Sequence, residues 1–269
     1  MKKKIALKFG FTLIELLVVI SIIAVLMSIM MPALAKVRRQ AQKSVCASNF
    51  HQVGIVHLAY SADHGQWVPR FTAVNGEEVH IPVGQAISGV VPYFMGDKIY
   101  QLLKSGYGTE AEFWVCPSLR AKNAKRGFLG TVDFSQEDLP RNGDKPNPRN
   151  MGILNLVGLT NMTITEPKDV PECAQKPTDS SDKILAADLN IRWGNDWNNQ
   201  ATAISHQGKG KKGHAMPEGA NRLYTDGSAK WVDLKEMGPD RSDGKTLLDD
   251  DRIAGKYDHW PSQGRDYFW

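Results

Sequence analysis

The sequence lacks the patterns that mark most enzymes and most nucleic-acid-binding proteins. It has no internal repeat, no extended low-complexity tract and no His-Glu-x-x-His or similarly tight spacing of metal ligands. It also has no charge excess beyond its N-terminus, because the four lysines among the first ten residues equal the whole formal excess of +4. Composition therefore gives no reason to expect a nucleic-acid partner, and we expect no enzymatic activity.

Cysteine is scarce as well, with three residues in 269. An odd number means that at least one thiol stays free or pairs between chains, so the chain is not a disulfide scaffold. At this length, with 42% hydrophobic residues, it can instead bury a core of its own and form one globular domain.

What the sequence does have is a long apolar run, residues 11–31. Its only polar members are Thr12, Glu15, Ser21 and Ser28. At about 1.5 Å per residue, such a helix spans the roughly 30 Å hydrocarbon layer, which predicts a single-pass transmembrane helix. A secretory signal peptide, cleaved so that the mature chain starts near Lys36, is the alternative.

Glu15 is the unusual residue of this run. An ionised carboxylate inside lipid costs several kcal/mol unless it is paired, so its presence is a functional hypothesis by default. The alternative is a side chain that snorkels to the bilayer surface. Charge does not give the orientation of the helix, because lysine and arginine are equally frequent on its two sides.

The stretch "KFGFTLIELLVVISIIAVL" resembles the signal of type IV prepilins and type II secretion pseudopilins. The matching features are a basic leader, Gly10 before the cut, Phe11 as the new N-terminus and Glu15 as the fifth mature residue. The resemblance implies that a prepilin peptidase removes residues 1–10 on the cytoplasmic face and that the new amino group is methylated. It also implies an inner-membrane protein with a cytoplasmic N-terminus and a periplasmic or extracellular C-terminal domain.

The same resemblance explains a charge at bilayer depth. In a filament, the positive N-terminus of one subunit can lie beside Glu15 of its neighbour, so that two charges that are costly in lipid neutralise each other and set the axial register. Pro32 stands where pilin-like helices often carry a proline, and we expect it to kink or locally melt the helix.

Beyond Pro32 the pattern predicts that the helix continues to about Tyr60, with one apolar face that packs on a sheet. That face comprises Cys46, Phe50, Val53, His57 and Tyr60. We expect His57 to be a core histidine with satisfied hydrogen bonds rather than a ligand.

Short apolar segments then predict strands. They are residues 113–116, 153–157, 183–187, 222–225 and 229–234, and Asp226-Gly227 predicts a hairpin turn between the last two. The expected organisation is a leader (1–10), a transmembrane helix (11–31), its extramembrane continuation (32–64), a globular β domain (65–235) and a tail (236–269). The fold class is therefore α+β and pilin-like, with a long N-terminal helix packed on an antiparallel sheet.

A second stretch, "GHAMPEGANRLYTDGSAKWVD", resembles the C-terminal signature of a planctomycete-type group of pilin-like proteins, in which a His precedes an Asp-Gly pair. Here eleven residues separate His214 from Asp226, and His206 is the alternative match if "QGKGKKG" is an insertion. "CASNF" and "FWVCPS" resemble the same group, which makes Cys46 and Cys116 the first disulfide pair to test.

Several of these residues are candidates for a divalent metal. Asp188 and Asp226 would supply oxygen, and His206 or His214 nitrogen. In the simpler interpretation Asp226 and Gly227 only form the turn. Calcium at the acidic run of residues 249–251 is a further alternative, although the glycine spacing of a calcium loop is absent.

The expected function is assembly into a type IV pilus or a type II secretion pseudopilus, with prepilin peptidase and other pilin-like subunits as partners and no cofactor. One alternative is a membrane-tethered binding protein of the same processing route, which would capture an anionic extracellular glycan through Lys209, Lys211 and Lys212. Another is an anchored metal hydrolase.

Overall fold

A computed structural model describes the chain over residues 12–68, 71–74, 77–80, 94–120, 138–139, 149–157, 173–174, 176–193, 203–209, 215–234 and 265–268. The chain divides into two compact units, Met1–Gln42 and Lys43–Trp269. One helix, α1 (Leu13–His64), contributes to both units, which are described separately below.

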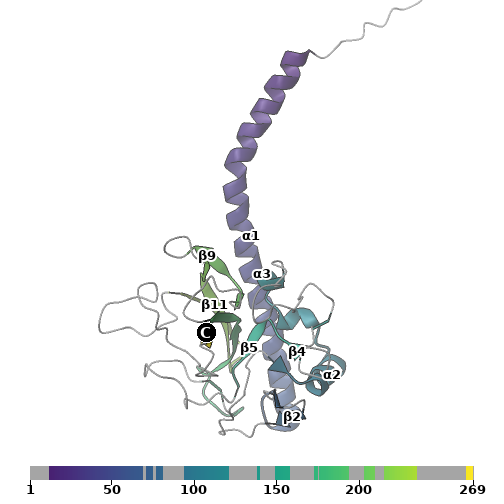
Figure 1. Ribbon diagram of the computed structural model, residues 1–269. Helices are drawn as coiled ribbons and strands as arrows, with labels where there is room; N and C mark the ends of the chain where they lie inside the picture. Colours follow the sequence, from purple (N-terminus) through teal and green to yellow (C-terminus); the bar gives the residue numbers. More distant parts are fainter. Residues whose placement is uncertain are drawn as a thin grey trace, which may run out of the picture. The chain divides into compact units, whose positions relative to one another are not determined.

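In the first unit, α1 is the only described element. Pro32 lies inside it, and the helix continues through this position without a break (Figure 1). Of the two expected effects of Pro32, a kink or local melting, the unbroken helix rules out the melting. A proline removes one backbone hydrogen bond, whereas the remaining apolar turns on either side keep the helical geometry.

In the second unit, α1 stops at His64, which is four residues beyond Tyr60 and is the last residue of the predicted continuation (32–64). Gly65 follows with a φ of 66°, and its N–H donates to the Ser61 carbonyl at 2.8 Å. A left-handed glycine directly after the last turn is a common helix end, because glycine adopts positive φ without a steric penalty.

The main sheet of this unit has four antiparallel strands in the order β12-β11-β6-β5. They are β5 (Ile153–Asn155), β6 (Ile184–Asp188), β11 (Gly219–Tyr224) and β12 (Ala229–Asp233). Four of the five predicted strands correspond to them, with ends that differ by up to three residues. Together with α1, the sheet confirms the α+β, pilin-like fold class.

Smaller strand pairs complete the described β structure. The strand β13 pairs with β7, so residues near the C-terminus join a sheet of the domain. The remaining strands are β1 (Phe71–Val74), β2 (Glu77–His80), β3 (Phe94–Met95), β4 (Arg149–Asn150), β7 (Asn190–Trp193), β8 (Ala203–Ile204), β9 (Gln207–Lys209), β10 (Ala215–Pro217) and β13 (Arg265–Phe268).

The fifth predicted strand, residues 113–116, is wrong. Its residues belong to the 3₁₀ helix η1 (Ala111–Trp114) and to the connection that leads into α3 (Pro117–Arg120). A short apolar run does not distinguish a strand from a buried helical turn, and Pro117 favours the first position of a helix. Only Val115 makes a β-type contact, an isolated parallel bridge to Gly152.

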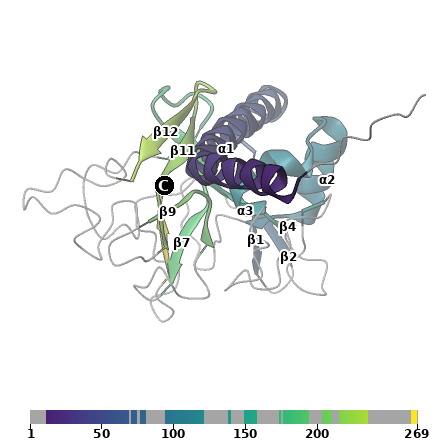
Figure 2. The same ribbon diagram turned by 90° about the horizontal axis from the view of Figure 1, so that it is seen from above.

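The core of the second unit forms around the buried face of α1. In Figures 1 and 2 this part of α1 lies between β11 and the short helices α2 (Asp97–Gly106) and α3. All five residues of the predicted apolar face are buried. At Gly54 the helix approaches the hairpin so closely that an added Cβ would lie 3.0 Å from Leu223 Cδ1 and 3.4 Å from Gly227 Cα.

Candidate functional site

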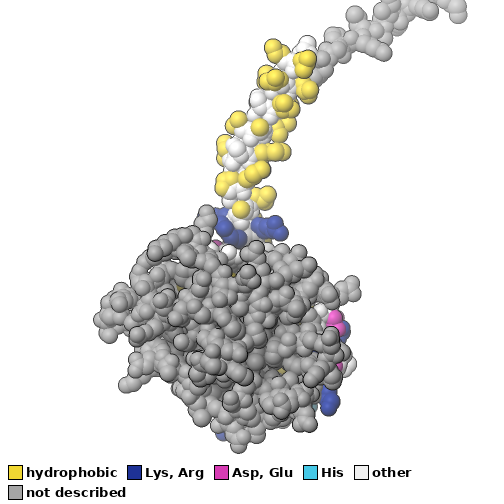
Figure 3. Space-filling view, viewed as in Figure 1, with side chains coloured by type: hydrophobic (Ala, Val, Ile, Leu, Met, Phe, Trp, Pro, Cys, Tyr) yellow, Lys and Arg dark blue, Asp and Glu magenta, His cyan; other side chains and the backbone are white. Residues whose placement is uncertain are grey.

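The N-terminal part of α1 exposes every side chain that it carries. Each residue from Thr12 to Ala41 is exposed, including seventeen large hydrophobic side chains between Leu13 and Val37. Figure 3 shows these apolar side chains covering the visible face of the helix up to a group of basic residues. Among the described residues, α1 is the one helix long and apolar enough to cross a membrane.

The two serines of the apolar run are bonded within the helix. The hydroxyl groups of Ser21 and Ser28 donate to the carbonyl oxygens of Val18 and Val25, each at 2.7 Å. Such bonds within one turn remove the need for a water partner inside the hydrocarbon layer. The segment is therefore compatible with lipid on all sides except at Glu15.

Glu15 forms a capping box with Thr12 at the start of α1. Its Oε2 accepts hydrogen bonds from the Thr12 backbone N–H at 2.9 Å and from the Thr12 hydroxyl at 2.7 Å. The Glu15 N–H in turn approaches Thr12 Oγ1 at 3.3 Å. The sequence interpretation missed this role, although Thr-x-x-Glu before an apolar run is its known signal. Gly10 and Phe11 lie outside the described residues.

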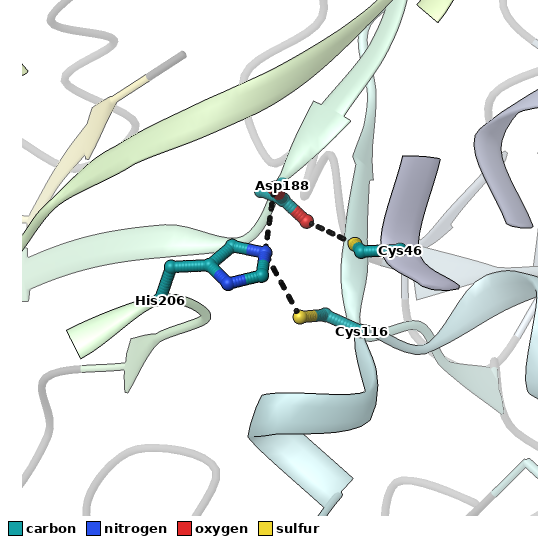
Figure 4. A group of neighbouring side chains, drawn as sticks. All are labelled: Cys46, Cys116, Asp188 and His206. Carbon is teal, nitrogen blue, oxygen red and sulfur yellow. Dashed lines mark hydrogen bonds and ion pairs between the residues drawn. The ribbon is translucent and has the colours of Figure 1, made fainter. Parts of the chain in front are cut away.

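The second unit contains a buried cluster of four side chains, Cys46, Cys116, Asp188 and His206 (Figure 4). Their donor atoms all lie within 4.8 Å of one another. Cys46 Sγ donates to Asp188 Oδ1 at 2.9 Å, and His206 Nε2 lies 3.3 Å from Asp188 Oδ2 and 3.4 Å from Cys116 Sγ. We call this group the Cys-Asp-His cluster.

Each member of the cluster comes from a different segment. Cys46 belongs to the buried face of α1, and Cys116 lies between η1 and α3. Asp188 is the last residue of β6, and His206 lies between β8 and β9. No spacing along the sequence could therefore have revealed the group as a whole.

The loop that carries His206 is held by hydrogen bonds on both sides. The N–H and hydroxyl of Ser205 donate to the Leu189 carbonyl at 3.1 and 2.9 Å. The His206 carbonyl accepts from the Glu218 N–H at 2.8 Å. The ring itself contacts Trp231 edge to face at 5.1 Å, so both its backbone and its imidazole are fixed.

Asn221, on the adjacent strand β11, supports the carboxylate. Its backbone N–H and its side-chain Nδ2 donate to Asp188 Oδ2 at 2.7 and 2.8 Å. Sequence reasoning did not identify Asn221 as a functional residue. Its only signal was its place in the quoted hairpin stretch, which does not reveal a partner on β6.

The cluster carries buried charge. Burial disfavours the charged forms, but the charge of His206 and its hydrogen bond keep the pKa of Asp188 low. Burial also opposes protonation of His206, yet Asp188 and Cys116 together raise the pKa of His206 to about 10.

The two thiols behave differently. Burial, the hydrogen bond with Cys116 and the Asp188 charge raise the pKa of Cys46. For Cys116 burial acts in the same direction, but hydrogen bonds from Cys46 and His206 outweigh it and lower its pKa to about 5. Asp188 and His206 thus favour opposite charges on each other, while burial and the Asp188 charge favour the neutral thiol of Cys46.

The structure thus joins two predictions that the sequence treated separately. Asp188 and His206, predicted as metal ligands, lie beside Cys46 and Cys116, predicted as a disulfide pair. The two cysteines are close, but both carry free thiols. Asp226 does not take part, because it is exposed in the β11–β12 turn.

That turn has the geometry that its sequence predicts. Gly227 has a φ of 78°, and the Ser228 N–H donates to Asp226 Oδ1 at 2.8 Å. Asp226 and Gly227 are therefore turn residues. His214, the lysines at 211 and 212 and the acidic run at 249–251 lie outside the described residues, and nothing is described of the Lys209 side chain.

Comparison with known families identifies the N-terminus alone. Residues 6–31 match the family described as the prokaryotic N-terminal methylation motif. Neither the curated proteins nor the solved structures gave a match to the chain. The chain thus carries a prepilin-type signal, which supports processing by a prepilin peptidase and anchoring in a membrane.

Proposed function

We propose that this protein is a pilin-like structural subunit, which prepilin peptidase processes and which assembles through α1 into a type IV pilus or a type II secretion pseudopilus. The observation that carries the proposal is the methylation motif of residues 6–31, which leads directly into a helix with apolar side chains exposed all around it. The subunit would sit in the inner membrane with a cytoplasmic N-terminus before it assembles.

Exposure of this helix explains why it needs partners. An amphipathic helix of a single domain buries one apolar stripe, whereas this segment leaves every face uncovered. Lipid covers such a surface before assembly, and neighbouring helices of the same kind cover it in a filament. The small and polar residues at positions 21, 24 and 28 suit close helix contacts.

Glu15 retains a free position for a partner. Both hydrogen bonds from Thr12 end on Oε2, and no described residue bonds to Oε1. A carboxylate accepts several hydrogen bonds, so Oε1 can take the methylated amine of a neighbouring Phe11 while Oε2 caps its own helix. The two roles of Glu15 are therefore compatible.

Two substitutions separate these roles. Glu15→Gln retains an oxygen that can accept the capping bonds but removes the charge, and Glu15→Val removes both. We expect filaments, imaged by electron microscopy on cells, to disappear in both variants, because the neighbour's amine then lacks a counter-charge. Thr12→Ser, which keeps the hydroxyl, serves as the matched control and should assemble normally.

Mass spectrometry of the mature chain completes the experiment. A methylated N-terminal Phe11 in all variants would show that processing is intact and that the defect lies in assembly. Normal filaments with Glu15→Gln would contradict the charge-pairing role. An absence of filaments in the parent strain, with full membrane anchoring, would favour a non-polymerising tether, and a mature start near Lys36 would contradict the processing route.

A further inference from the structure

We propose that the Cys-Asp-His cluster is a structural zinc site that fastens α1 to the rest of the second unit. The proposal goes beyond assembly, because it concerns buried side chains of the second unit that lie outside the methylation motif. It rests on the donor atoms, their distances and their burial.

The four donors are those that zinc prefers in proteins. Zinc binds cysteine sulfur, histidine nitrogen and carboxylate oxygen, nearly always in a tetrahedral set of four. The cluster supplies two sulfurs, one nitrogen and one oxygen. Calcium and magnesium favour six or more oxygen ligands, so the two thiols argue against both.

The distances also suit one ion. Bonds of about 2.0 to 2.3 Å in a tetrahedron place neighbouring donors roughly 3.3 to 3.8 Å apart. The His206 nitrogen already lies 3.3 Å from Asp188 Oδ2 and 3.4 Å from Cys116 Sγ. Cys46 contacts the other carboxylate oxygen, Oδ1, at 2.9 Å, and the donor atoms span up to 4.8 Å, so a small rotation of the Asp188 carboxylate and a contraction of about 1 Å bring the four donors to tetrahedral distances around one ion.

Burial indicates a structural rather than a hydrolytic role. All four residues are buried, and four protein ligands leave no open position for water or substrate. Asn221 provides the outer support that ligating carboxylates usually have, with two hydrogen bonds to Asp188. The site would join α1, the η1–α3 connection, β6 and the β8–β9 loop, which stabilises the position of the helix on the sheet.

Zinc binding releases protons. Zinc needs two thiolates and a neutral imidazole, so the thiol proton of Cys46 and one proton of His206 leave for solvent as the dication enters. No oxidant or reductant takes part.

The first test measures metal in the full chain, purified in detergent under reducing conditions. We expect one zinc per chain by elemental mass spectrometry, a marked loss of zinc in Cys116→Ser and His206→Gln, and full zinc in Cys173→Ser. Cys173 is a buried cysteine outside the cluster, so it is a matched control for loss of a thiol. Asn221→Ala should keep the ligands but lower zinc affinity about 10- to 100-fold.

A ligand variant that fails to fold would lose zinc for that reason alone. A second measurement therefore uses the unaltered chain. The unaltered chain, stripped with a chelator and loaded with cobalt, should show thiolate-to-cobalt charge-transfer absorption, and zinc should protect Cys46 and Cys116 from alkylation. If the stripped chain takes up clearly less than one zinc per chain when zinc is added back, the proposal is overturned. A native mass two hydrogens lower with a Cys46–Cys116 linked peptide would also overturn it, since a disulfide would then occupy the site. Glu15→Val should retain its zinc, which keeps this test separate from that of assembly.

Discussion

The two parts of α1 differ in how they use apolar side chains. From Leu13 to Val37 the helix is apolar on all faces and entirely exposed, whereas from Cys46 to Tyr60 it buries one stripe and exposes the other faces. Both parts have regular helical geometry within one unbroken element. Local structure is therefore the same, and the difference lies in what each part requires around it.

This contrast separates folding from assembly. The second part finds its partners within its own chain, in the sheet and the short helices. The first part is exposed over its whole length, as a membrane-anchoring helix requires. Substitutions in the second part should change the stability of the folded domain, and those in the first part should change membrane insertion and assembly instead.

The largest loss of stability is expected for a substitution of Phe50, which is 1% exposed and belongs to the buried stripe. Phe50→Ala should lower the free energy of unfolding of the second unit by about 3–5 kcal/mol, because it leaves a cavity. Ile20→Ala in the exposed part should change it by less than about 0.5 kcal/mol. All seven tryptophans lie beyond residue 42, so their fluorescence during urea unfolding in detergent reports on the second unit. Equal effects of the two substitutions would contradict the contrast.

The next largest effect is a dependence of the stability of the second unit on pH, and it arises from the protonation of His57. Its ring is fully buried, neither nitrogen has a hydrogen-bond partner among the described residues, and burial lowers the pKa to about 3. The prediction of a core histidine is confirmed, but the expectation of satisfied hydrogen bonds is wrong. The unfolded chain binds a proton near pH 6.5 and the folded chain near 3, so stability is full above 6.5 and is lost as the pH falls towards 3.

At pH 5 this loss amounts to about 2 kcal/mol relative to pH 7. His57→Met, which fills a similar volume with an apolar side chain, should flatten the decline by that amount. Urea titrations at the two pH values measure the difference. An unchanged pH profile in the variant would show that His57 does not titrate as described.

A smaller effect is expected at the start of the exposed part. Thr12→Ala removes the capping hydroxyl and should weaken the first turn of α1 by about 1 kcal/mol, whereas Thr12→Ser should be neutral. Faster hydrogen exchange at residues 13–16 in micelles would show the loss. The second unit should keep its unfolding midpoint, since the cap serves only the first part of the helix.

The smallest effect is expected at Lys43, the first residue of the second unit. Its Nζ lies 2.9 Å from Glu218 Oε2 and 3.8 Å from the centre of the Trp231 ring. Lys43→Met should lower the stability of the second unit by about 0.5 kcal/mol, because the contacts are partly solvated. The same substitution at Lys36, seven residues earlier, should have no measurable effect on urea unfolding of that unit.

Much of the fold follows from short-range patterns. The apolar run, the buried face from Cys46 to Tyr60 and the Asp226-Gly227 turn each depend on spacing within one or two turns, and each was predicted. The strand predicted at residues 113–116 is wrong, because a four-residue apolar segment supports either backbone conformation until its neighbours choose one. Arg149 shows the same limit: it is buried and bonds Asp97 at 2.6 Å and Asp138 at 3.0 Å, and no pattern in the sequence suggested either partner.

For the candidate sites, the sequence by itself determined the processing signal and the apolar helix that is long enough to cross a membrane, because both depend on the order of residues in one continuous segment. Only the tertiary structure decided the Cys-Asp-His cluster. Cys46, Cys116, Asp188 and His206 come from four segments, the first and last of which lie 160 positions apart, and side chains from such segments meet only after a helix, a sheet and two connections have packed together. Donor atoms bind a metal through their distances in space, which residue spacing across separate elements does not encode.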